Sequence, residues 1–134
     1  GERRLPLILN NVHRYAFYLA LILNVVLTID AILALQTPQG QWGYVGLGTL
    51  ILFANAAALW LYTLSCHSCR NAVGGRITHF SKHPVRYKMW TFISKLNEHH
   101  MLWAWVSLCT VVLADFYAYL LASGRISDLV FFSV

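Results

Sequence analysis

Three stretches of about twenty mostly apolar residues dominate this sequence. They cover residues 15–35, 44–64 and 101–122, and their only charged side chains are Asp30 and Asp115. A stretch of roughly 20 apolar residues is long enough to cross the hydrocarbon core of a bilayer as a helix. The sequence therefore predicts an all-α membrane protein with three transmembrane helices.

Composition agrees with this prediction. The chain has 134 residues, of which 58% are hydrophobic and 11% are charged. Soluble domains carry about 25% charged residues, and a small domain exposes much of its surface to water. The composition therefore excludes a soluble enzyme, a disordered tail and a small disulfide-stapled secreted module.

The connections between the stretches differ in length. Residues 36–43 contain Pro38 and Gly40, which predict a short turn. Residues 65–100 form a long connection, in which apolar residues recur at helical spacing with basic residues between them. The apolar positions after Pro84 are Val85, Met89, Phe92, Ile93 and Leu96. We expect an amphipathic helix at the membrane surface, which serves either as a lipid-contacting linker or as a docking surface for a soluble partner.

The basic residues are strongly segregated. If the three stretches cross the membrane in succession, nine of the ten fall on one side and only Arg125 falls on the other. The nine are Arg3, Arg4, Arg14, Arg70, Arg76, Lys82, Arg86, Lys88 and Lys95. The positive-inside rule places that side, the N-terminus included, in the cytoplasm. This segregation explains the formal charge of +5 better than nucleic-acid binding does.

All six histidines share the predicted cytoplasmic side with two of the three cysteines. The histidines are His13, His67, His79, His83, His99 and His100. Cys66 and Cys69 follow the second stretch, His13 precedes the first, and His100 precedes the third. Three helix ends are therefore expected to bring metal-ligating side chains to one level of the membrane.

A Cys-x-x-Cys pair with nearby imidazoles can hold a zinc ion, form a redox dithiol, or bind an iron–sulfur cluster with mixed ligands. A Rieske-type cluster uses two cysteines and two histidines. The preferred set here is Cys66 and Cys69 with His67 and His100, and the further candidates are His13 and His79. Two alternatives stay open: a b-type haem held by two of His13, His67 and His100, and a non-catalytic metal-handling or assembly protein.

Polar residues within the apolar stretches form a second group of candidates. Asn24 and Asn55 are expected near mid-depth and are typical of hydrogen bonds between helices. Asp30 and Asp115 are expected at matching levels nearer the outer side, where a carboxylate is costly. For these two, a partner or proton role and simple structural pairing both remain open.

Four runs of sequence resemble the membrane-anchor subunit of succinate dehydrogenases. They are LSCHSCRNAVGG, HFSKHPVRYKMW, SKLNEHHMLWAWVSL and ADFYAYLLASG, and the resemblance covers residues 14–124. It is greatest to the actinobacterial-type branch of respiratory complex II, whose anchors are longer and have more than three spans. The chain is therefore expected to correspond to their C-terminal part and to lie in a bacterial cell membrane.

The resemblance implies a function and a set of partners. Anchors of this branch are associated with a Rieske-type [2Fe–2S] cluster in place of haem, and its motifs fall here on Cys66, His67, Cys69 and His100. Electrons would arrive from a soluble flavoprotein and an iron–sulfur subunit and leave to quinone. The candidate quinone contacts are Ser81, His83, Arg86, Tyr87 and Trp103. The aromatic members of this group also fit an ordinary interfacial belt.

Overall fold

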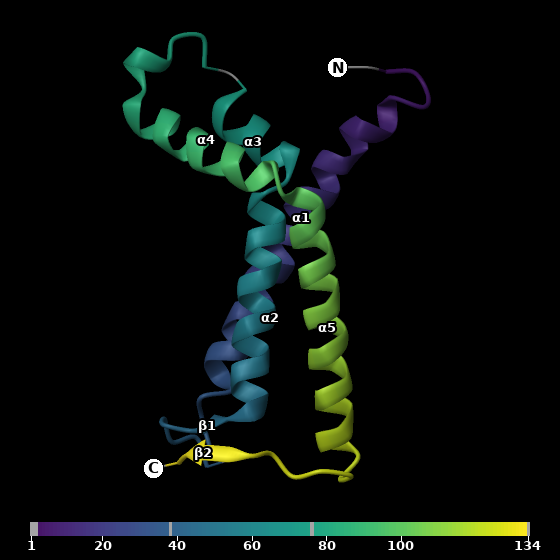
Figure 1. The fold of residues 1–134 in the computed structure, drawn as a ribbon, viewed down its shortest axis with the longest axis vertical. Coiled ribbons are helices and arrows are strands. Elements are labelled where there is room, and N and C mark those ends of the chain that lie inside the picture. Colours follow the sequence, from purple (N-terminus) through teal and green to yellow (C-terminus); the bar gives the residue numbers. More distant parts are fainter. Residues whose placement is uncertain (1–2, 38, 76, 134) are drawn as a thin grey trace.

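Long helices form the body of the protein (Figure 1). The computed structural model describes residues 3–37, 39–75 and 77–133. The long helices are α1 (Ile8–Leu33), α2 (Leu47–Leu64) and α5 (His100–Ala122). All three are long and apolar enough to cross a membrane. The prediction of an all-α membrane protein is confirmed. We call the end where α1 begins and α2 ends the histidine end, and the opposite end the strand end.

Two of the three helices begin away from the expected residue. Helix α1 starts seven residues before the predicted span, at Ile8, so that His13 and Arg14 lie on the helix itself. Helix α2 starts at Leu47 because the preceding residues form strand β1 (Val45–Gly46). With 18 residues at about 1.5 Å each, α2 is roughly 27 Å long, close to the thickness of a bilayer core.

Hydrogen bonds join the long helices at buried polar residues. On α1, the Asn24 side-chain amide donates to Thr63 Oγ1 at 2.8 Å and to the Leu59 carbonyl at 3.2 Å. On α5, the Thr110 hydroxyl donates to Asn55 Oδ1 at 3.1 Å. Such contacts hold helices together where no hydrophobic effect drives them to associate. Asn24 and Asn55 are therefore the interhelical contacts that the sequence suggested.

The two intramembrane carboxylates lie elsewhere. Asp30 and Asp115 are both exposed on the helix surfaces of this chain, on α1 and α5. Their position on outward faces does not favour the simple structural pairing considered from the sequence. A carboxylate at such a depth is normally turned toward another helix or a watery cavity.

The strand end is closed by a small sheet and one carboxylate. Strand β1 pairs antiparallel with β2 (Val130–Phe132) beyond the end of α5. Asp128, just before β2, accepts hydrogen bonds from the Gly48 amide at 3.0 Å, from the Tyr44 hydroxyl at 2.8 Å and from the Tyr117 hydroxyl at 2.6 Å. The side chain thus binds the N-terminus of α2, where free amide groups favour an anion. The spacing of residues in the sequence does not predict this arrangement.

At the histidine end, the long connection folds into three helical pieces. They are α3 (His67–Gly74), the 3-10 turn η1 (Phe80–Lys82) and α4 (Pro84–Asn97). Helix α4 is the expected amphipathic helix, and its first residue is the proline that the sequence indicated. Val85, Met89 and Phe92 are exposed along one face, whereas Ile93 is buried.

Helix α3 packs closely on α4. The Arg86 guanidinium donates two hydrogen bonds to the Val73 carbonyl, at 2.6 and 3.1 Å. Gly74 lies directly under the Trp90 ring, and any added Cβ would overlap it. A residue without a side chain at this position therefore allows the two helices to approach each other, and α4 in turn supports the segment that carries Cys66 and Cys69.

Candidate metal centre

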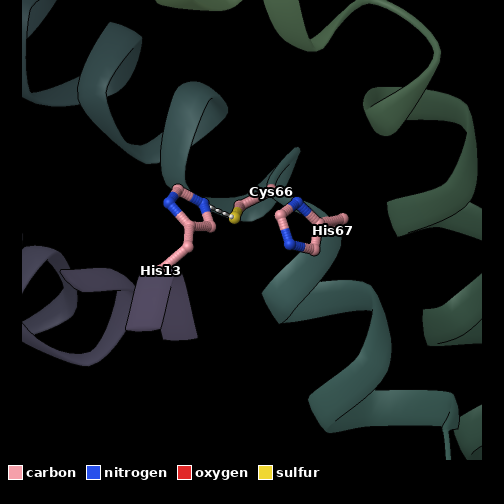
Figure 2. Close-up of side chains that lie close together, drawn as sticks. All are labelled: His13, Cys66 and His67. Carbon is pink, nitrogen blue, oxygen red and sulfur yellow. Dashed lines mark hydrogen bonds between the residues drawn. The ribbon is translucent and has the colours of Figure 1, made fainter. Parts of the chain in front are cut away.

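His13, Cys66 and His67 form the tightest group of metal-ligating side chains in the described part of the chain. Their ligand atoms all lie within 4.8 Å of one another. His13 Nε2 is 3.1 Å from Cys66 Sγ, and the His13 and His67 rings are stacked with centroids 4.8 Å apart. Figure 2 shows the sulfur between the two imidazoles, one from α1 and one from α3.

The local backbone explains why Cys66 occupies this position. Helix α2 ends at Leu64, and Cys66 adopts an extended conformation as the N-cap of α3. Its sulfur accepts a hydrogen bond from the Ser68 amide at 3.4 Å. A cap side chain satisfies one of the free amides of a first helical turn. The side chain is 4% exposed.

Cys69 lies one turn further along α3. It is buried in an apolar cluster that also contains Phe17, Cys66 and Ile93. Burial raises the pKa of the Cys69 thiol, and the neighbouring Cys66 adds to the effect. The thiol is therefore protonated near neutral pH, and a metal that binds it must displace the proton. Cys69 is not a member of the three-residue group.

The electrostatics favour a neutral imidazole at His67. Burial lowers its pKa, and the nearby His13 and Arg14 lower it further. Neutral imidazole is the form that binds metals, because one ring nitrogen keeps its lone pair. The side chain that the sequence placed inside the Cys-x-x-Cys motif is thus in a ligand-competent state.

His100 stands at the first turn of α5, beside the same group. Together with His13, Tyr62 and Cys66 it lines a cavity of about 210 Å³ between the helices. Its Nδ1 is 2.7 Å from the Ser65 hydroxyl, and its ring stacks on Tyr62 at 5.0 Å. His13 and Cys66 therefore belong both to the three-residue group and to the cavity that His100 lines. His79, the remaining candidate ligand, lies outside the three-residue group and contacts Thr78 Oγ1 at 3.0 Å.

The candidate quinone contacts do not form one cluster. Ser81 lies in η1, and His83 caps α4. Arg86 is bound to the Val73 carbonyl, and Tyr87 packs against Phe80 and Trp90. Trp103 is separate from these four, on α5, where its indole N–H is buried without an acceptor among the described residues.

A larger polar cavity adjoins His67 and was missed in the sequence. It measures about 500 Å³ and is lined by residues of α1 and α3 together with Phe80 and Trp90. Two of its residues are arginines: Arg14 donates to Asn71 at 2.8 Å, and Arg70 stacks over the Trp90 ring at 4.9 Å. The only sequence signal was their position, because Arg14 follows His13 and Arg70 follows Cys69.

Known proteins resemble the chain over most of its length. The family described as actinobacterial succinate dehydrogenase subunit SdhC matches residues 1–124. A chain in the solved structure of the Mycobacterium smegmatis Sdh1 complex in the apo form is 60% identical, with a TM-score of 0.85. That alignment covers 96% of this chain and 48% of the other, so this chain spans about half the length of its relative. No curated protein matches it. The chain therefore belongs to the family of actinobacterial succinate dehydrogenase membrane subunits.

Proposed function

We propose that this chain holds a Rieske-type [2Fe–2S] cluster and relays electrons from a soluble iron–sulfur subunit of succinate dehydrogenase to quinone. The observation that carries the proposal is the group of one sulfur and two imidazoles, with ligand atoms within 4.8 Å of one another. It lies at the end of the bundle where the basic residues collect. That end is the cytoplasmic face by the positive-inside rule, with the N-terminus inside.

The donor set fits such a cluster. A Rieske centre needs two thiolates on one iron and two imidazoles on the other. Cys66 and Cys69 are the two thiols, and both belong to the same buried cluster of residues. The two imidazoles come from among His13 and His67, which lie nearest to Cys66, and His100, which lines the adjoining cavity together with His13 and Cys66. When bound, such a cluster carries one electron at a potential of about −150 to +300 mV, above the roughly −400 mV of plant-type ferredoxins.

The residues of this chain prepare the site. Cys66 and Cys69 are buried, so water is excluded from the sulfurs. His67 is held in its neutral form by burial and by the positive charge of Arg14, which lower its pKa. The Ser68 amide donates to Cys66 Sγ and so fixes the position of that atom.

Quinone is the proposed electron acceptor, and Trp103 is its best-supported contact. A buried indole N–H without an acceptor costs free energy, and a quinone oxygen would satisfy it. Ser81, His83, Arg86 and Tyr87 remain candidate contacts along η1 and α4. The proposed partners are the soluble flavoprotein and iron–sulfur subunits, which would dock on the cytoplasmic face, and further membrane helices.

A b-type haem is the alternative cofactor. The His13 and His67 rings lie face to face with an interplanar angle of 21°. Two of His13, His67 and His100 would hold a haem, each through a ring nitrogen rather than through a stacked ring face. A thiol at 3.1 Å from His13 also suits mixed sulfur and nitrogen ligation. These observations favour the cluster.

Electron paramagnetic resonance on the purified, dithionite-reduced complex tests the proposal. We expect a Rieske-like signal and iron in excess of that in the soluble subunits. The variant Cys66→Ser should lose both, whereas Cys109→Ser should keep them, because Cys109 is exposed on α5 away from the site. A sharp reduced α-band in the optical spectrum would instead identify haem. Zinc without excess iron would identify a metal-handling protein, and either result overturns the cluster.

A further inference from the structure

Ser65 is a buried side chain whose role lies outside the ligand set. It connects the end of α2 to the start of α5, and it is 0% exposed. Its hydroxyl oxygen makes two short contacts, at 2.7 Å to the Tyr62 carbonyl and at 2.7 Å to His100 Nδ1. Both contacts are of hydrogen-bond length, but a hydroxyl has only one hydrogen to donate.

The Tyr62 carbonyl needs that hydrogen. In a continuing α-helix, this carbonyl would accept from the Cys66 amide. The helix ends here, however, and the Cys66 amide bonds instead to the Thr63 carbonyl at 3.2 Å. A carbonyl oxygen can only accept, so the 2.7 Å contact between two oxygens requires the Ser65 hydroxyl to donate to Tyr62.

In the contact between Ser65 and His100, the hydrogen must therefore come from His100. If the Ser65 hydrogen points at Tyr62, the oxygen can only accept from His100, and Nδ1 must carry a hydrogen. In neutral imidazole, a hydrogen on Nδ1 leaves the lone pair on Nε2. The hydrogen-bond geometry of one serine therefore selects one of the two tautomers of His100.

Neighbouring groups fix the orientation of the His100 ring as well as its tautomer. The Asn97 side-chain amide donates to the Ser65 carbonyl at 2.7 Å, which ties this residue to the end of α4. The His100 ring lies on Tyr62 with an interplanar angle of 15°. The imidazole is thus held on one face by an aromatic ring and at one nitrogen by a buried hydroxyl.

We propose that Ser65 is a positioning residue that keeps the hydrogen of His100 on Nδ1 and reserves Nε2 as the ligand atom toward the cavity shared with Cys66. The tautomer follows from the hydrogen bonds alone, and only the ligand role of Nε2 rests on the proposed function. Partners of this kind set the tautomer and basicity of metal-bound histidines, and removing one typically costs about 10- to 100-fold in metal affinity.

The first test is nitrogen NMR on the assembled complex with isotope-labelled histidine, after the metal has been removed with a chelator. The His100 signals are assigned by their loss in His100→Gln. We expect a protonated Nδ1 and an unprotonated Nε2 in the unmodified protein. A proton on Nε2 would overturn the proposal, and this measurement needs no variant at Ser65.

The second test compares two buried serines. Ser65→Ala should lose the protonated Nδ1 signal, and it should lose metal to a competing chelator at about 10- to 100-fold lower chelator concentration. Ser107→Ala is the matched control, because its buried hydroxyl donates to the Ala104 carbonyl at 3.0 Å and contacts no histidine in the described chain. Unchanged His100 signals in Ser65→Ala would refute the positioning role. A complex that holds no metal, but shows the expected tautomer, would refute the proposed function alone.

Discussion

The carboxylate of Asp128 joins three parts of the chain that are far apart in sequence. It binds the first turn of α2 through the Gly48 amide, and it accepts from the hydroxyls of Tyr44 and Tyr117. Burial by itself raises the pKa of Asp128, but the hydrogen bonds from Tyr117, Gly48 and Tyr44 outweigh burial and lower it. The same contacts raise the pKa of Tyr44, chiefly through its hydrogen bond to Asp128.

Asp128→Asn is expected to lower the free energy of unfolding at neutral pH by about 1–3 kcal/mol, because a charged acceptor of several hydrogen bonds is lost. A carboxylate whose pKa is lowered by folding stabilises the fold at pH values above its ordinary pKa of 3.8. It loses that effect as the pH falls through the lowered pKa. Thermal unfolding in detergent across this acid range measures both effects.

The control for Asp128 is Glu98→Gln, the same chemical change at an exposed residue on the other end of the molecule. It should leave stability within about 0.5 kcal/mol of the unmodified protein. An Asp128→Asn protein that unfolds at the same temperature as this control would contradict the role given to Asp128.

The sequence indicated which residue types make the site, but not which of them meet. His13, Cys66, His67 and His100 were all candidates, because topology alone brings three helix ends to one level. The distance between His13 and Cys66 depends on how α1 is rotated against α2, and this rotation is fixed by packing and by bonds such as Asn24 to Thr63. The spacing of residues along the sequence gives no information about this rotation.

At the scale of elements, α3 and α4 form a hairpin-like support for the site. Helix α4 was predicted from its apolar spacing and its leading proline. Helix α3 was not, since eight residues with mixed polarity give little periodic signal. The link between them is the Arg86 guanidinium on the Val73 carbonyl. This contact gives Arg86 a structural role in addition to its candidacy as a quinone contact.

Arg86→Met is expected to loosen the C-terminal turn of α3. Loss of the two hydrogen bonds at an exposed site is worth about 1 kcal/mol, so amide hydrogen exchange over residues 71–75 should speed up roughly fivefold. Lys88→Met is the control, because Lys88 is exposed on α4 and lies elsewhere on its surface. A raised KM for quinone with unchanged exchange would instead show that Arg86 acts on the substrate.

At the scale of the whole molecule, the long helices share few large buried side chains. The buried residues of α2 are alanines, threonines and one asparagine, and α2 packs against both α1 and α5. Close contact of small residues with a few interhelical hydrogen bonds is typical of packing in membranes. The number of spans was predictable because apolar length alone determines it. The closure at the strand end was not, because it depends on a contact between residues 48 and 128.

The proposed orientation in the membrane rests on the segregation of charge and can be measured directly. In a Cys109→Ser background, Arg3→Cys and Lys95→Cys should resist a membrane-impermeant maleimide in intact cells, whereas Ser127→Cys should react. Permeabilised cells should label all three positions, which controls for accessibility. Labelling of Arg3→Cys and protection of Ser127→Cys in intact cells would reverse the orientation given by the positive-inside rule.

The stability of α3 depends on the sulfur atom that caps it, that of Cys66. Eight residues are too few to form a stable helix alone, so α3 depends on its packing and on its first turn. The Ser68 amide donates a hydrogen bond to the Cys66 sulfur and so holds the first turn in place. By thermodynamic linkage, a ligand that binds this sulfur in the geometry of the cap favours the folded α3, and the folded α3 favours that ligand. Since α3 carries Arg70 and Asn71 to their contacts with α4 and α1, chemistry at the sulfur and order at the surface of this end are reciprocally coupled.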